Sequence, residues 1–239
     1  MRLVIFDLDD TLIDFASTRQ EAYRHIGELV TREGLEAAPY LQACAVADRP
    51  LFARFERGEL TRAEYRARRF LEPFEQMRCV PRQGLVEEIN RLFMDCVNDS
   101  PLLHDDALPA LDRLRAQGLR TAILTNGPSD GQRRKLLATG LGERVELVAI
   151  GEEIGASKPL AKAFLHVVRH FGLDPEQALM VGDSPELDHD AARAAGLEAL
   201  LLDRAGAHRS GVRARVESLH TVLAHGDAHR GSAFSERPK

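Results

Sequence analysis

The chain has 239 residues, of which 44% are hydrophobic and 29% charged, a balance that is ordinary for a globular protein with a sizeable core. Its formal net charge is −5 and its basic residues are spread out, which argues against a nucleic-acid-binding surface. No apolar run approaches the roughly 18 residues of a membrane-spanning helix, and the apolar start is too short for a signal peptide. We therefore expect a cytoplasmic protein with reduced cysteines and with neither a nucleic-acid nor a membrane partner.

The first predicted element is a buried strand. Leu3 to Phe6 is a short, continuous apolar run, which is typical of a strand covered on both faces in a parallel sheet. Asp7 and Asp9 follow at the carboxyl end, where open α/β sheets bind their ligands. Two such carboxylates repel each other unless a cation or a shared proton intervenes, and Mg²⁺ favours oxygen ligands. Taken alone, the stretch is equally compatible with an acidic turn.

A helical block interrupts this α/β beginning. Thr18–Glu21 matches a capping box, and helical apolar spacing continues to about Asn98. We expect a discontinuous core of residues 1–14 and 99–226, an inserted helical cap of residues 15–98, and a disordered tail of residues 227–239. The block is rich in arginine, which usually indicates solvated helix faces. Arg19 or Arg24 is a candidate to meet a second anionic group of a substrate.

From Pro101 onward, helical and strand patterns alternate. This alternation predicts right-handed βαβ units, and hence an α/β fold with a doubly wound, Rossmann-like parallel sheet. The expected elements are helix Asp106–Gln117, strand Leu119–Thr125, helix Ser129–Thr139, strand Val145–Ile150, helix Pro159–Phe171, strand Ala178–Val181, helix Leu187–Ala195, strand Glu198–Leu202 and a short helix near Ser218–Ala224.

Further polar side chains follow the predicted strands. Thr125 and Asn126 end one strand, Asp183 ends another, and Asp188 lies shortly after it. Lys158 precedes a proline and a helix, so it can reach the same edge from a loop. Because the carboxyl ends of parallel strands share one edge, these groups should converge with the aspartates of the first strand. Carboxylates, a hydroxyl and an ammonium together suit phosphoryl transfer.

The same residues carry a family resemblance. Asp7-Leu8-Asp9-Asp10-Thr11 resembles the first motif of the haloacid dehalogenase superfamily, and Thr125-Asn126-Gly127 resembles the second. Lys158-Pro159 resembles the third motif, and Gly182-Asp183-Ser184 with Asp188 resembles the fourth. The four motifs occur in the family's order, and the chain is most similar to the phosphatases that carry a helical cap after the first motif.

The resemblance implies roles for the acidic residues. Asp7 is expected to be the nucleophile that forms an aspartyl-phosphate, and Asp9 the general acid and base. The expected Mg²⁺ site comprises Asp7, Asp183 and the backbone carbonyl of Asp9. Asp188 is expected to act through water or from just outside the coordination sphere, or else simply to sit at a helix N-terminus.

The resemblance also implies a phosphoryl-binding set and a reaction. Thr125 and Lys158 are expected to hold the phosphoryl oxygens, while Asn126 either shapes the turn or touches substrate. The expected activity is Mg²⁺-dependent hydrolysis of a small phosphorylated metabolite. A phosphomutase or a haloacid dehalogenase of the same superfamily remains an alternative, although the dehalogenases generally lack an aspartate in the position of Asp9. A phospho-accepting binding module is a more remote alternative.

Overall fold

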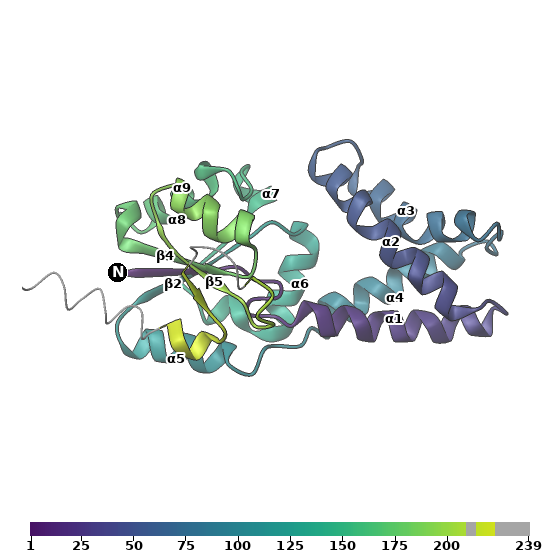
Figure 1. The fold of residues 1–239 in the computed structure, drawn as a ribbon, viewed down its shortest axis with the longest axis horizontal. Helices are drawn as coiled ribbons and strands as arrows, with labels where there is room; N and C mark the ends of the chain where they lie inside the picture. The colour runs from purple at the N-terminus through teal and green to yellow at the C-terminus, as the bar shows by residue number, and fades with distance from the viewer. Residues whose placement is uncertain (209–213, 223–239) are drawn as a thin grey trace, which may run out of the picture. The chain divides into compact units, whose positions relative to one another are not determined.

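The computed structural model describes residues 1–208 and 214–222, and the chain divides into two compact units (Figure 1). The α/β unit consists of Met1–Phe15 and the chain from Pro101 onward, and the helical unit is Ala16–Ser100. Among the helices of the described ranges, none combines the length and the apolar character that a membrane span requires.

A sheet of parallel strands forms the centre of the α/β unit. Its order over the described residues is β3-β2-β1-β4-β5-β6, with β1 hydrogen-bonded to β2 on one side and to β4 on the other. The order changes direction between β1 and β4, which leaves a crevice at the carboxyl ends of these two strands. The strands are β1 (Leu3–Phe6), β2 (Arg120–Thr125), β3 (Leu147–Ile150), β4 (Ala178–Gly182), β5 (Glu198–Leu202) and β6 (Arg215–Val216).

Helices cover both faces of this sheet, because alternate side chains of each strand point to opposite sides. The helices are α5 (Ala107–Ala116), α6 (Ser129–Thr139), α7 (Gly151–Ile154), α8 (Ala161–His170) and α9 (Ala191–Ala194). On β1, Val4 and Phe6 belong to the core that α5 and α6 share, whereas Leu3 and Ile5 belong to the core with α8 and α9. The predicted doubly wound α/β fold is confirmed.

The end of the α/β unit differs from the sequence prediction. Residues expected to form one helix from Leu187 form a π-helical turn, Pro185–Asp190, before the single turn of α9. The Ser184 hydroxyl begins this turn by accepting the Leu187 N–H at 3.2 Å. A short helix was expected near residues 218–224, and the structure has a 3-10 turn there, at Leu219–Thr221. Residues 223–239, which include the predicted disordered tail, lie outside the described ranges.

Four helices make up the helical unit: α1 (Phe15–Arg32), α2 (Ala37–Glu56), α3 (Arg62–Gln76) and α4 (Leu85–Asp99). The capping box predicted at Thr18 is wrong, because α1 already begins at Phe15 and buries Thr18 inside the helix. A capping box starts α3 instead, where the Thr61 hydroxyl accepts the Glu64 N–H at 3.2 Å and the Glu64 carboxylate accepts the Thr61 N–H at 2.7 Å.

Aromatic side chains dominate the interior of the helical unit. Tyr40 packs against Phe74 with ring centroids 4.6 Å apart, and Phe70 against Phe93 at 5.5 Å. Arg69 is buried among them, with its guanidinium 4.2 Å from the Phe93 ring centroid. One of the arginines of this block therefore packs in the interior rather than on a solvated face.

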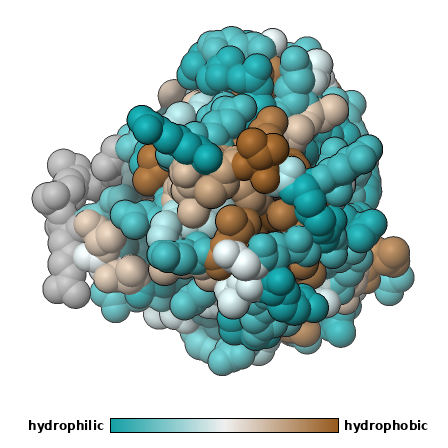
Figure 2. Space-filling model, turned by 90° about the vertical axis from the view of Figure 1, so that its right-hand side faces the viewer, coloured by the Kyte–Doolittle hydropathy of each residue, from teal (hydrophilic) through white to brown (hydrophobic). Residues whose placement is uncertain are grey.

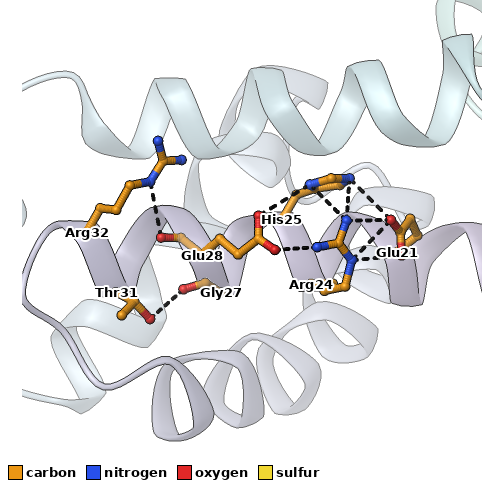
Figure 3. Close-up of polar contacts among 7 residues, drawn as sticks. All are labelled: Glu21, Arg24, His25, Gly27, Glu28, Thr31 and Arg32. Atoms are coloured by element: carbon orange, nitrogen blue, oxygen red, sulfur yellow. Dashed lines mark hydrogen bonds and ion pairs between the residues drawn. The ribbon is translucent and has the colours of Figure 1, made fainter.

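The arginine at Arg24 does lie on a solvated face. It forms ion pairs with Glu21 at 2.7 Å and with Glu28 on the exposed side of α1 (Figure 3). Its charge is therefore matched locally, which removes the reason to assign it to a substrate anion.

On the face shown in Figure 2, hydrophilic residues predominate and a smaller group of hydrophobic residues lies near the centre. Such limited apolar exposure is usual for a folded surface.

Candidate active site

Three carboxylates meet at the carboxyl edge of the sheet. Asp7 directly follows β1, Asp183 follows β4, and Asp188 lies in the π-helical turn. One carboxylate oxygen of each lies within 4.8 Å of the others. Gly182 makes this approach possible, because a Cβ atom there would lie 2.3 Å from the Asp188 carboxyl carbon. The structure thus brings together residues that the first and fourth motifs placed far apart in sequence.

Lys158 lies between two of these carboxylates. Its Nζ atom is 2.5 Å from Asp7 Oδ1 and 2.6 Å from Asp188 Oδ1, and the residue is only 5% exposed. The Asn126 side chain fixes the backbone that carries it, donating to the Lys158 carbonyl at 2.7 Å and accepting the Lys158 N–H at 2.8 Å. Of the two roles considered for Asn126, this geometry favours shaping the loop, since both ends of its amide are engaged.

Both oxygens of Asp188 accept hydrogen bonds. Oδ1 accepts from the Lys158 ammonium, and Oδ2 accepts the backbone N–H of Ser184 at 3.0 Å. Thr11, from the first motif, donates its hydroxyl toward Asp183 Oδ1 at 3.4 Å and is fully buried. These contacts, donated by Lys158, Ser184 and Thr11, hold the acidic side chains in place from three separate parts of the chain.

The site carries surplus negative charge. Burial raises the pKa of Asp7 well above its usual value, and the charges of Asp188 and Asp183 add to this effect against the opposing influence of Lys158. Burial and the neighbouring Asp188 likewise raise the pKa of Asp183 to about 6. Although burial alone would lower the pKa of Lys158, the carboxylates of Asp7 and Asp188 raise it, so the ammonium form is favoured.

The donor set fits a small divalent cation. One ammonium faces the buried carboxylates of Asp7 and Asp188 and the half-buried Asp183, and the pKa values of Asp7 and Asp183 are raised by burial and by the neighbouring negative charges. Mg²⁺ takes oxygen ligands, most often one or two carboxylates with waters. A divalent cation at this edge would neutralise the surplus charge and lower both pKa values.

The Asp9 side chain lies outside the carboxylate cluster. Its Oδ1 accepts a hydrogen bond from Lys135 Nζ at 2.6 Å, and its Oδ2 accepts one from Gln132 Nε2 at 3.0 Å. The same Gln132 nitrogen donates to the hydroxyl of Thr125 at 2.6 Å. The four residues therefore connect the first motif to the second. A metal role for Asp9 was expected only through its backbone carbonyl, so this orientation of the side chain is compatible with that expectation.

Sequence reasoning missed Gln132 and Lys135. Both belong to α6, and their spacing of three residues puts them on one face of the helix. The sequence shows only that they belong to the helix after the loop that follows Thr125, and this position does not reveal that both side chains are buried. Gly127 in that loop gives Gln132 its room, because a Cβ atom at Gly127 would lie 2.5 Å from the Gln132 amide.

Known proteins resemble this chain in sequence and in fold. Over 225 residues the chain is 32% identical to the phosphoserine phosphatase of Thermus thermophilus, covering 85% of this chain and 89% of that protein. It is 27% identical to the glyceraldehyde 3-phosphate phosphatase of Methanopyrus kandleri, covering 85% and 84% of the two chains. The fold is similar to that of a magnesium-bound HAD-hydrolase of Bacillus subtilis, with a TM-score of 0.74 at 24% identity over 94% and 97% of the chains.

A model of a protein family also matches most of the chain. Residues 1–196 match the haloacid dehalogenase-like hydrolases, a range that includes all four motifs. The curated relatives described above are phosphatases and are matched over most of their lengths. The chain therefore belongs to the haloacid dehalogenase-like hydrolase family.

Proposed function

We propose that this enzyme is a Mg²⁺-dependent phosphatase that hydrolyses a small phosphorylated metabolite through an aspartyl-phosphate on Asp7. The observation that carries the proposal is the cluster of Asp7, Lys158, Asp183 and Asp188 at the carboxyl edge of the sheet, in which all but Asp183 are buried. This cluster combines a carboxylate nucleophile, a fixed ammonium and oxygen ligands for a cation, which are the parts that phosphoryl transfer requires.

In the proposed first step, a carboxylate oxygen of Asp7 attacks phosphorus and the bond from phosphorus to the leaving oxygen breaks. For this step Asp9 carries a proton on Oδ2, which can donate while it still accepts from Gln132, and gives it to the leaving oxygen, so the product leaves as a neutral alcohol. Lys158 and the Thr125 hydroxyl hold the phosphoryl oxygens on which negative charge accumulates. Thr125 remains able to donate its own proton, since it accepts rather than donates in its contact with Gln132.

In the proposed second step, Asp9 takes a proton from a water molecule that attacks the phosphorus of the intermediate. The bond to Asp7 breaks, which releases inorganic phosphate and restores the carboxylate. The carboxylates of Asp7 and Asp183, with the Asp9 carbonyl and the nearby Asp188, would hold Mg²⁺. Its positive charge would offset the negative charge of the phosphoryl group. The dehalogenases of this superfamily need no metal and generally lack an aspartate in the position of Asp9, so the cluster of carboxylates and the retained Asp9 favour the phosphatase.

We further propose that the helical unit is the cap and that it selects the leaving group. A pocket of about 250 Å³ lies within this unit. Its polar lining comprises Arg19, Gln20, Tyr23, Asp48 and Arg49. Two guanidinium groups and one carboxylate make the pocket suitable for a small polar group that bears negative charge. Arg19 lines this pocket and Arg24 does not, so Arg19 is the arginine that we assign to the substrate.

The test is a hydrolysis assay with nitrophenyl phosphate and a panel of phosphorylated metabolites. We expect turnover that requires Mg²⁺, disappears in excess chelator, and is abolished by Asp7→Asn. Wild-type activity that persists undiminished in chelator would contradict the proposed metal requirement. The ranking of metabolites in the same panel identifies the substrate class.

A further inference from the structure

Lys135 is a buried cation that contacts a carboxylate and an aromatic ring among the described residues of the α/β unit. The residue is 4% exposed, and its Nζ atom lies 2.6 Å from Asp9 Oδ1 and 4.3 Å from the centroid of the Phe15 ring. A lysine ammonium is costly to bury unless its charge is matched, and a carboxylate together with an aromatic face provides such a match. The position of this ammonium is therefore determined by Asp9 and Phe15 together.

Gln132 completes the contacts to the same carboxylate. It is 1% exposed, and its single amide nitrogen donates both to Asp9 Oδ2 at 3.0 Å and to the Thr125 hydroxyl at 2.6 Å. Each oxygen of Asp9 thus has its own donor from α6. Two donors on two oxygens fix the plane of the carboxylate as well as its position, which a single ion pair would not do.

We propose that Lys135 and Gln132 are positioning residues for Asp9, and that the contact between Lys135 and Phe15 links Asp9 to the start of the helical unit. The inference rests on the proposed function, in which Asp9 moves a proton to and from reacting oxygens. Proton transfer needs hydrogen-bond distance, and a displacement of about 1 Å can cost on the order of 10²-fold in rate.

The contact between Lys135 and Phe15 matters because Phe15 lies at the boundary of the two units. Phe15 is the last residue of the α/β unit and the first residue of α1, and the helical unit begins at the next residue, Ala16. Because the Phe15 ring contacts the ammonium that binds Asp9 Oδ1, we expect a substitution of Phe15 to affect Asp9 through Lys135.

The first test compares Lys135→Met with Lys135→Arg and with the control Arg133→Met. Arg133 lies on the same helix but pairs with Glu153 on the surface. For Lys135→Met we expect kcat to fall at least about tenfold further with an alkyl phosphate than with nitrophenyl phosphate, because only the alkoxide needs a proton. KM should change little, Lys135→Arg should recover part of the loss, and Arg133→Met should behave as wild type.

Two results would overturn the proposal. One is an equal loss of kcat with both leaving groups in a Lys135→Met protein that melts as wild type does. The other is no loss with either substrate. Gln132→Leu should show the same leaving-group dependence, and Phe15→Leu, which removes the aromatic face but keeps an apolar side chain, should show it more weakly.

A crystal structure of Lys135→Met separates this inference from the proposed function. We expect Asp9 to adopt another rotamer or several, while Asp7, Lys158 and Asp188 stay in place. Suppose that the wild type hydrolyses no phosphate ester while the Asp9 side chain changes its rotamer in the variant structure. In that case the proposed function is wrong and the positioning role of Lys135 is still supported. An Asp9 side chain that is unmoved in the variant structure contradicts the positioning role, whatever the activity.

Discussion

At the scale of single residues, Lys158 has the largest expected effect. Lys158→Met would leave Asp7 and Asp188 as neighbouring buried carboxylates without their shared cation. Removing one partner of a buried ion pair typically costs about 3–5 kcal/mol of stability. We therefore expect a destabilisation of this order in metal-free urea unfolding, together with loss of turnover. The exposed Lys162 provides the matched control, and Lys162→Met should leave both properties unchanged. A Lys158→Met variant as stable and active as wild type would contradict the assigned contacts.

Gly182 is a second residue with a local, testable role. In Gly182→Ala the new Cβ would collide with the Asp188 carboxyl group, so Asp188 must move away from Lys158. We expect a loss of turnover and a destabilisation of about 1–3 kcal/mol, which is typical of overpacking. Gly142→Ala is the control, because a Cβ there would meet only Leu136 at an ordinary 3.9 Å. Equal behaviour of the two variants in activity and thermal melting would count against this account of Gly182.

The candidate site was predictable where its residues sit at strand ends. Asp7 and Asp183 directly follow buried strands and Thr125 is the last residue of another, so one periodicity argument places all three at the same edge. Lys135 and Gln132 carry no such signal. On a polar helix a lysine and a glutamine are expected to be solvated, and only the packing of α6 against the first motif shows that both are buried.

At the scale of elements, Asp106 joins α5 to the segment that follows β6. Its carboxylate accepts from Arg204 at 2.7 and 2.9 Å, from the Ser218 hydroxyl at 2.8 Å and from the Leu219 N–H at 2.9 Å. Burial alone would raise the pKa of Asp106, but these donors outweigh it and lower the pKa to about 2. The contacts thus stabilise the folded protein only while Asp106 is ionised.

This linkage predicts how stability depends on pH. Because the folded pKa lies below the unfolded value of about 3.9, the contribution is fully present above pH ~4 and is lost as pH falls toward ~2. Asp106→Asn should therefore be less stable than wild type at pH 7, by about 2 kcal/mol, and the difference should shrink in acid. Urea unfolding at several pH values measures this. A difference between the two proteins that stays constant down to pH ~2.5 would contradict the assignment.

The predictability of the elements follows their length and periodicity. The strands β1, β2, β4 and β5 are mainly apolar runs, and this pattern predicts their burial from the sequence. Helix α6 has the predicted bounds of Ser129–Thr139. The two residues of β6 and the four of α7 are too short to produce a periodic signal. The start of α1 was misplaced because Thr18–Glu21 matches a capping box that the helix does not use.

At the scale of the whole molecule, we propose that one unit carries out phosphoryl transfer and the other selects the substrate. The α/β unit contains all the groups assigned to phosphoryl transfer, whereas the pocket with Arg19 and Arg49 belongs to the helical unit. We expect Arg19→Gln and Arg49→Gln to change the ranking of metabolites while turnover of nitrophenyl phosphate stays within about threefold of wild type. Arg24→Gln, which removes only surface ion pairs, is the control. An unchanged ranking in both pocket variants would argue against this assignment of the pocket.

The most direct measurement of the central claim is to trap the phosphoryl-enzyme. The protein is mixed with Mg²⁺ and a phosphorylated substrate, quenched in acid during turnover, digested and analysed by mass spectrometry. The account predicts one phosphoryl group on the peptide that contains Asp7, its disappearance in Asp7→Asn, and its accumulation when Asp9→Asn slows hydrolysis of the intermediate. A protein that turns over the substrate while the phosphoryl group is found on another residue would contradict the account.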